Sequence, residues 1–140
     1  MSDPVLESRS PRVLVVDDER HVRSMLCDLL AMWGCTPESV PTAVQGLDRL
    51  EREAYDLVLT DFRMPEMSGV ELIERIRARD GRLAVIMLTA SVADLDATGQ
   101  RLGFTFLRKP LEIAGLKAAL DQALVRQATS ESAAAAHDVL

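Results

Sequence analysis

Short runs of apolar residues alternate along the chain with longer segments that have apolar residues at helical spacing. Four runs lie at 13–16, 57–59, 85–88 and 104–107, and most of them are uninterrupted. An uninterrupted apolar run is typical of a strand covered on both faces, as in a parallel sheet. A weaker run at 35–40 contains Pro37, which lacks the amide hydrogen that an interior strand needs. The pattern therefore predicts five strands, one of them at an edge.

Between these runs, apolar residues recur every three or four positions, which indicates amphipathic helices. The helical segments predicted in this way are 22–33, 44–50, 70–76, 92–102 and 113–124. Strand and helix thus alternate five times. This alternation predicts an α/β fold with an open, doubly wound, five-stranded parallel sheet, five helices and right-handed crossovers.

The length of 140 residues allows one domain. Residues 1–10 are polar and predict an N-terminal arm, and residues 11–127 hold the whole strand and helix pattern. Residues 128–140 are polar or alanine and offer little bulky apolar surface for packing. They predict a tail that is either disordered or the beginning of a linker.

The charge balance limits the classes of partner. Sixteen Lys and Arg against 22 Asp and Glu give a net charge of −6, which repels phosphate backbones and anionic lipids. No apolar run reaches the length of a membrane span. We therefore expect a cytoplasmic protein that binds neither nucleic acid nor membrane directly. The basic residues at 75, 77, 79 and 82 are predicted to be a solvated helix end.

Acidic, hydroxylic and basic residues follow the predicted strands. Asp17 and Asp18 follow the first run, Asp61 the third strand, Thr89 the fourth and Lys109 the fifth. With strand order 2-1-3-4-5, these strand ends lie side by side where ligands bind in such sheets. Carboxylates that converge in this way repel one another unless a cation holds them ionised.

A hard divalent ion such as Mg²⁺ suits this set of oxygen ligands. Asp18 and Asp61 are predicted as direct ligands, and Asp17 as a ligand through water. The cation and Lys109 would offset the charge that develops when Asp61 attacks phosphorus. Thr89 is placed to hydrogen-bond a phosphoryl oxygen.

Across residues 12–127 the sequence resembles the receiver domain of two-component response regulators. The matching pieces are VVDDE at 15–19, DFRMPEMSGVE at 61–71, LTA at 88–90 and KP at 109–110. The resemblance implies a flavodoxin-like sheet and a phosphoacceptor, Asp61, that is charged by a sensor histidine kinase, a phosphotransfer protein or a small phosphodonor. It implies no enzymatic activity beyond self-phosphorylation and self-dephosphorylation.

The same resemblance implies further roles. Asp17, Asp18, Asp61 and the backbone carbonyl of Arg63 would hold Mg²⁺ or Mn²⁺. Thr89 and Lys109 would bind the phosphate, Phe106 would act in the switch together with Thr89, and Pro110 would follow a cis peptide bond. The face made by 92–102, 104–107 and 113–124 would then contact a downstream protein or a second copy of the chain.

Two other functions remain open at this point. A receiver-like module that binds partners without phosphorylation is expected to have lost an acid or the lysine, and this chain keeps them all. Haloacid-dehalogenase-type phosphatases also use an aspartate nucleophile with Mg²⁺, but they need a second aspartate two residues later as general acid. Here that position is Arg63. The chain itself is either a free-standing regulator or part of a longer protein.

Overall fold

The computed structural model describes residues 10–90 and 95–139, with side chains up to residue 126. Five strands form one sheet in which every neighbouring pair is parallel, in the order β2-β1-β3-β4-β5. The strands are β1 (Arg12–Val16), β2 (Thr36–Val40), β3 (Leu57–Asp61), β4 (Ala84–Thr89) and β5 (Thr105–Arg108). The predicted fold class and strand order are confirmed, with Pro37 on the edge strand β2.

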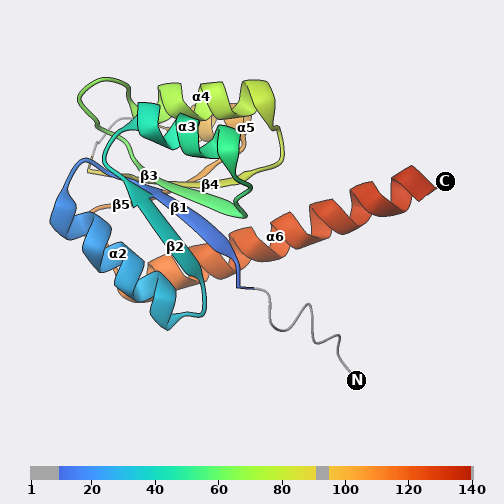
Figure 1. The fold of residues 1–140 in the computed structure, drawn as a ribbon, viewed down its shortest axis with the longest axis horizontal. Helices are drawn as coiled ribbons and strands as arrows, with labels where there is room; N and C mark the ends of the chain where they lie inside the picture. Colours follow the sequence, from blue (N-terminus) through green and yellow to red (C-terminus); the bar gives the residue numbers. More distant parts are fainter. Residues whose placement is uncertain (1–9, 91–94, 140) are drawn as a thin grey trace.

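Five helices cover the sheet in the described part of the chain, in two layers (Figure 1). The helices α3, α4 and α5 lie on one face, and α2 and α6 lie on the other. Their bounds are α2 (Arg20–Met32), α3 (Ala43–Arg52), α4 (Gly69–Arg79), α5 (Asp96–Leu102) and α6 (Ile113–Val139). None of these described helices combines the length and the hydropathy needed to cross a lipid bilayer.

The core consists of two apolar clusters, one on each face of the sheet. Alternate residues of β1 point to opposite faces, so Leu14 packs under α3 and α4 while Val15 packs under α2 and α6. Because both faces are covered, β1, β3 and β4 are buried almost throughout. This explains why the strands read as uninterrupted apolar runs.

Three segments differ from the sequence prediction or lie outside the structure. The helix predicted at 92–102 is short, since α5 begins at Asp96 and ends at Leu102, where it is followed by Gly103 with a left-handed φ of 72°; residues 91–94 are outside the described residues. The helix α6 continues through Val139 into the predicted tail, which agrees with the high helix propensity of its alanines. The predicted arm falls almost wholly on residues 1–9, which are not described. The domain boundaries therefore stay predictions.

Ser68 caps the helix that follows the loop after β3. Its side chain accepts a hydrogen bond from the amide of Glu71 at 3.1 Å. We expect Ser68→Ala to lower the free energy of unfolding by about 1 kcal/mol, because an amide at the start of α4 loses its acceptor. Ser68→Asp keeps an acceptor and should lose less. Urea unfolding measures both, and an equal loss in the two variants would contradict the capping explanation.

Candidate functional site

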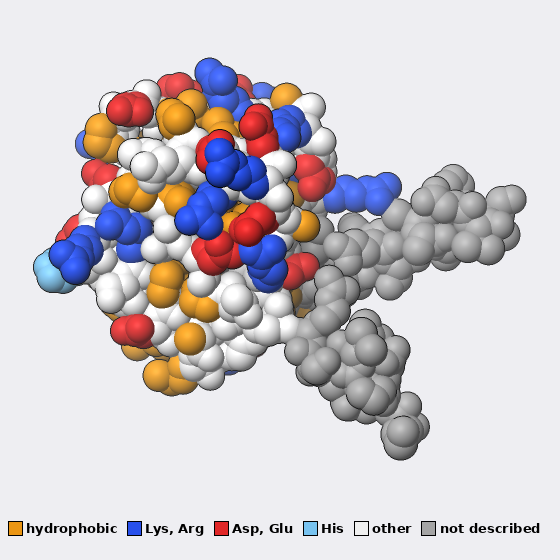
Figure 2. Space-filling view, in the orientation of Figure 1, with side chains coloured by type: hydrophobic (Ala, Val, Ile, Leu, Met, Phe, Trp, Pro, Cys, Tyr) orange, Lys and Arg blue, Asp and Glu red, His pale blue; other side chains and the backbone are white. Residues whose placement is uncertain are grey.

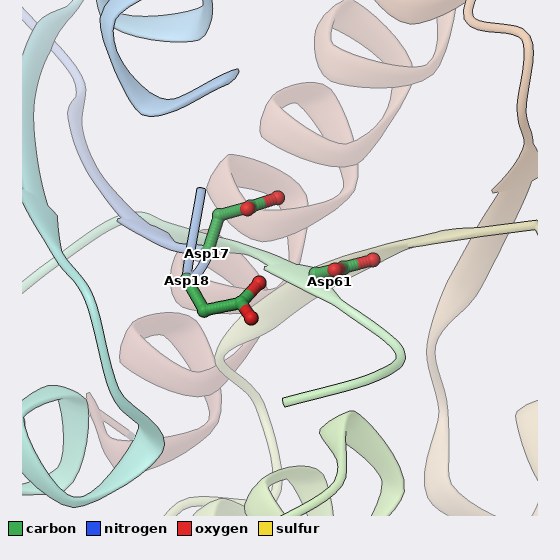
Figure 3. A group of neighbouring side chains, drawn as sticks. All are labelled: Asp17, Asp18 and Asp61. Carbon is green, nitrogen blue, oxygen red and sulfur yellow. The ribbon is translucent and has the colours of Figure 1, made fainter. Parts of the chain in front are cut away.

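Three aspartates meet at the carboxyl edge of the sheet. Asp17 and Asp18 directly follow β1, and Asp61 is the last residue of β3. The parallel pairing of Val16 with Thr60 brings the ends of the two strands together. Each aspartate offers a carboxylate oxygen, and these oxygens lie within 4.8 Å of one another (Figure 3). The structure thus brings together the acidic residues that the sequence predicted as neighbours.

Asp17 is the most buried of the three, with 1% of its surface exposed. Its Oδ1 accepts a hydrogen bond from the amide of Glu19 at 2.9 Å, whereas its buried Oδ2 has no partner among the described residues. Burial raises the pKa of Asp17, and the nearby charges of Asp61 and Asp18 raise it further, against the lowering effects of the Glu19 amide and Lys109. A buried carboxylate oxygen without a donor is the group that a bound cation would satisfy.

One carboxylate oxygen of Asp61 accepts hydrogen bonds, and 9% of the residue's surface is exposed. Oδ1 accepts hydrogen bonds from the amide of Phe62 at 2.9 Å and from Nζ of Lys109 at 3.2 Å. Among the described residues, no donor contacts Oδ2. The side chain is therefore held in place through one oxygen, while the other keeps its lone pairs for a new bond.

Thr89 and Lys109 come from adjacent strand ends. Thr89 is fully buried at the end of β4, and its carbonyl accepts a hydrogen bond from the amide of Lys109 at 2.7 Å. The peptide bond between Lys109 and Pro110 is cis. The ion pair between Lys109 and Asp61 brings one cation to the three carboxylates, and a divalent ion would balance their remaining charge.

Two other predicted site residues lie near this edge. Phe106 is partly buried on β5, packs against the cluster under α3 and α4, and has the guanidinium of Arg108 at 5.7 Å from its ring centre. Arg63 is exposed in the loop between β3 and α4. The metal contact predicted for its carbonyl stays a prediction.

Two residues of the site were missed in the sequence. Gly69 begins α4, and its amide donates to the carbonyl of Phe62 at 2.8 Å; a Cβ atom here would collide with the carbonyl oxygen of Asp61. Arg23, on the second turn of α2, donates from Nη1 to the carbonyl of Asp17 at 2.8 Å. The glycine in the motif at 61–71 could have indicated the role of Gly69, whereas nothing in the sequence pattern indicates a role for Arg23.

Comparison with known proteins adds the family. The family model described as the response regulator receiver domain matches residues 13–121. The chain belongs to this family. This chain is 34% identical over 125 residues to the transcriptional regulatory protein GlrR of Escherichia coli (strain K12). The match covers 88% of this chain and 28% of that protein. It thus spans less than a third of the length of this curated relative.

Solved structures give the same result. A signal receiver domain of an HD domain-containing protein from Pseudomonas fluorescens Pf-5 is 31% identical, with a TM-score of 0.80 over 86% of this chain and 99% of that one. The response regulator TrrA from Thermotoga maritima, in complex with Mg²⁺ and BeF, is 28% identical, with a TM-score of 0.74 over 81% and 98% of the two chains. Receiver domains of this family bind Mg²⁺ at an acidic pocket, interact with histidine kinases and are generally signalling domains rather than enzymes.

Proposed function

We propose that this receiver domain accepts a phosphoryl group on Asp61 from a sensor histidine kinase or a phosphotransfer protein. Asp17, Asp18, Asp61 and the backbone carbonyl of Arg63 would hold Mg²⁺, or Mn²⁺. The observation that carries the proposal is the convergence of three carboxylates and the Lys109 ammonium at one edge of the sheet. Oδ2 of Asp17, which is buried and has no hydrogen-bond partner among the described residues, supports the metal, because a buried carboxylate oxygen needs a donor or a cation.

The chemistry assigns a role to each side chain. An oxygen of Asp61 attacks phosphorus and forms an O–P bond, while the bond from phosphorus to the donor breaks and the donor keeps that electron pair. Lys109, already 3.2 Å from Asp61, stabilises the negative charge on the phosphoryl oxygens, and the bound cation would supply further stabilisation of that charge. Thr89 would donate a hydrogen bond to one phosphoryl oxygen.

The phosphate would also be the signal for partner binding. Thr89 and Phe106 stand on adjacent strands, β4 and β5, so a contact between Thr89 and the phosphate can change the packing around Phe106. The face made by α5, β5 and α6 would then bind a downstream protein or a second copy of the chain. The activity of any longer protein that contains this domain follows from parts beyond it.

Intact-mass measurement after incubation with acetyl phosphate and Mg²⁺ tests the phosphoacceptor. We expect the wild type to gain one phosphoryl group, Asp61→Asn to gain none, and chelation of the metal to prevent the gain. Asp48→Asn, at an exposed position on α3, is the matched control and should be phosphorylated normally. A wild type that takes up no phosphate would favour a phosphorylation-independent module, and turnover of a phosphate monoester would favour a phosphatase.

A further inference from the structure

Arg77 is a half-buried cation at the far end of the sheet from Asp61. Its guanidinium donates to three backbone carbonyls: Nε to Leu102 at 2.5 Å, Nη2 to Gly103 at 2.9 Å and Nη1 to Asp80 at 3.0 Å. These carbonyls lie at the ends of α4 and α5, where the helix dipole is negative. The prediction of a solvated side chain is wrong for Arg77, which is partly buried and bonded to the carbonyls of Leu102 and Gly103, 25 and 26 residues away in the sequence.

A cavity of about 200 Å³ opens beside this guanidinium, at the beginning of β4 and β5. Three arginines and a threonine line it, and none of the described residues that line it is acidic. Gly81 and Gly103 leave part of its wall without side chains. The polar residues of the lining are Arg77, Arg82, Arg126 and Thr105.

Basic residues outnumber acidic ones around this cavity, where Asp80 interacts electrostatically with Arg77. Arg82 and Arg126 are exposed, and neither makes an ion pair with any residue in the described part of the chain. Asp80 is the nearest acid in sequence, and its Oδ1 accepts from the amides of Arg82 and Leu83 at 2.8 and 3.2 Å. On the face drawn in Figure 2, by contrast, basic and acidic side chains lie next to one another.

From this arrangement we infer that the cavity is a binding site for a phosphate-sized oxyanion, either inorganic phosphate or the phosphate of a monoester. A guanidinium has five N–H donors, so Arg77 keeps two after its three carbonyl bonds, and the carbonyls fix its position. Arg82 and Arg126, which are exposed and line the cavity, supply further donors, and Thr105 supplies a hydroxyl. A phosphate dianion balances the charge of three cations better than a singly charged carboxylate does.

An NMR titration with inorganic phosphate, at constant ionic strength and without Mg²⁺, tests this site. We expect saturable shifts of the backbone amides at 81–85 and 103–105, with half-saturation below about 10 mM. Arg82→Gln and Arg126→Gln should each weaken binding about fivefold, the loss of one charge-assisted hydrogen bond. Arg75→Gln is the matched control, because Arg75 is exposed on α4 and lies outside the cavity lining.

Two further titrations identify the ligand and distinguish this site from the phosphoacceptor site. Glycerol 3-phosphate binding as tightly as phosphate identifies a monoester site, and binding of phosphate alone identifies a site for the free ion. The same amides should respond in Asp61→Asn, so the result is independent of phosphorylation. Shifts that do not saturate, or an equal weakening by Arg75→Gln, would overturn the inference and leave only general charge attraction.

Discussion

Gly69→Val is expected to lower the free energy of unfolding by about 3 kcal/mol or more, as overpacking against a rigid backbone does. A Cβ atom at this position would meet the carbonyl oxygen of Asp61 and the Cα of Phe62, and neither is the end of a flexible side chain. Relief requires α4 to move away from β3, which also breaks the hydrogen bond from the amide of Gly69 to the carbonyl of Phe62. Urea unfolding measures the loss.

Gly81→Ala is the control for this prediction. Apart from its two chain neighbours, no described residue has an atom within 4 Å of the position that its Cβ would take, and its backbone does not have a positive φ. We expect a change of about 0.5 kcal/mol or less. A comparable loss of stability in both variants would mean that the close approach of α4 to Asp61 does not constrain the fold.

The strands that the sequence marked most clearly are those whose burial is uniform. The strands β1, β3 and β4 are covered on both faces, so their apolar runs are uninterrupted. The edge strand β2 has one buried residue, Val40, and its proline indicated its position better than its hydropathy did. The site residues were predictable for a related reason, since parallel strands deliver their following residues to one edge.

Contacts between distant segments were not predictable from the pattern. Arg77 was grouped with its exposed neighbours because helical spacing shows which face a residue occupies, not which carbonyls meet it there. The helix α6 continues through Val139, beyond the apolar spacing that ends at residue 124, because alanine favours a helix without bulky apolar packing. Likewise, the burial of one oxygen of Asp17 follows only from the assembled fold.

The burial of this Asp17 oxygen leads to the second prediction with a large expected effect on stability. In the absence of Mg²⁺ at pH 7, we expect Asp17→Asn to be more stable than the wild type by about 1–3 kcal/mol. The substitution removes a carboxylate whose Oδ2 is buried without a partner and which faces Asp61 and Asp18. Asp28→Asn, which removes the same charge from an exposed position on α2, is the control and should change little. Urea unfolding with and without saturating Mg²⁺ is the measurement.

Adding Mg²⁺ should reverse this order. The wild type gains stability from the bound ion, and Asp17→Asn gains less because it has lost a ligand.

The pH dependence follows from the raised pKa of Asp17. In the folded state without metal, its proton is held to a higher pH than in the unfolded chain, so stability falls as the pH rises from the ordinary aspartate range through the raised pKa. Mg²⁺ requires the ionised form, so its stabilising effect grows as the pH rises. A wild type that is more stable than Asp17→Asn without metal would contradict the burial cost, and an equal gain from Mg²⁺ in both proteins would remove Asp17 from the metal site.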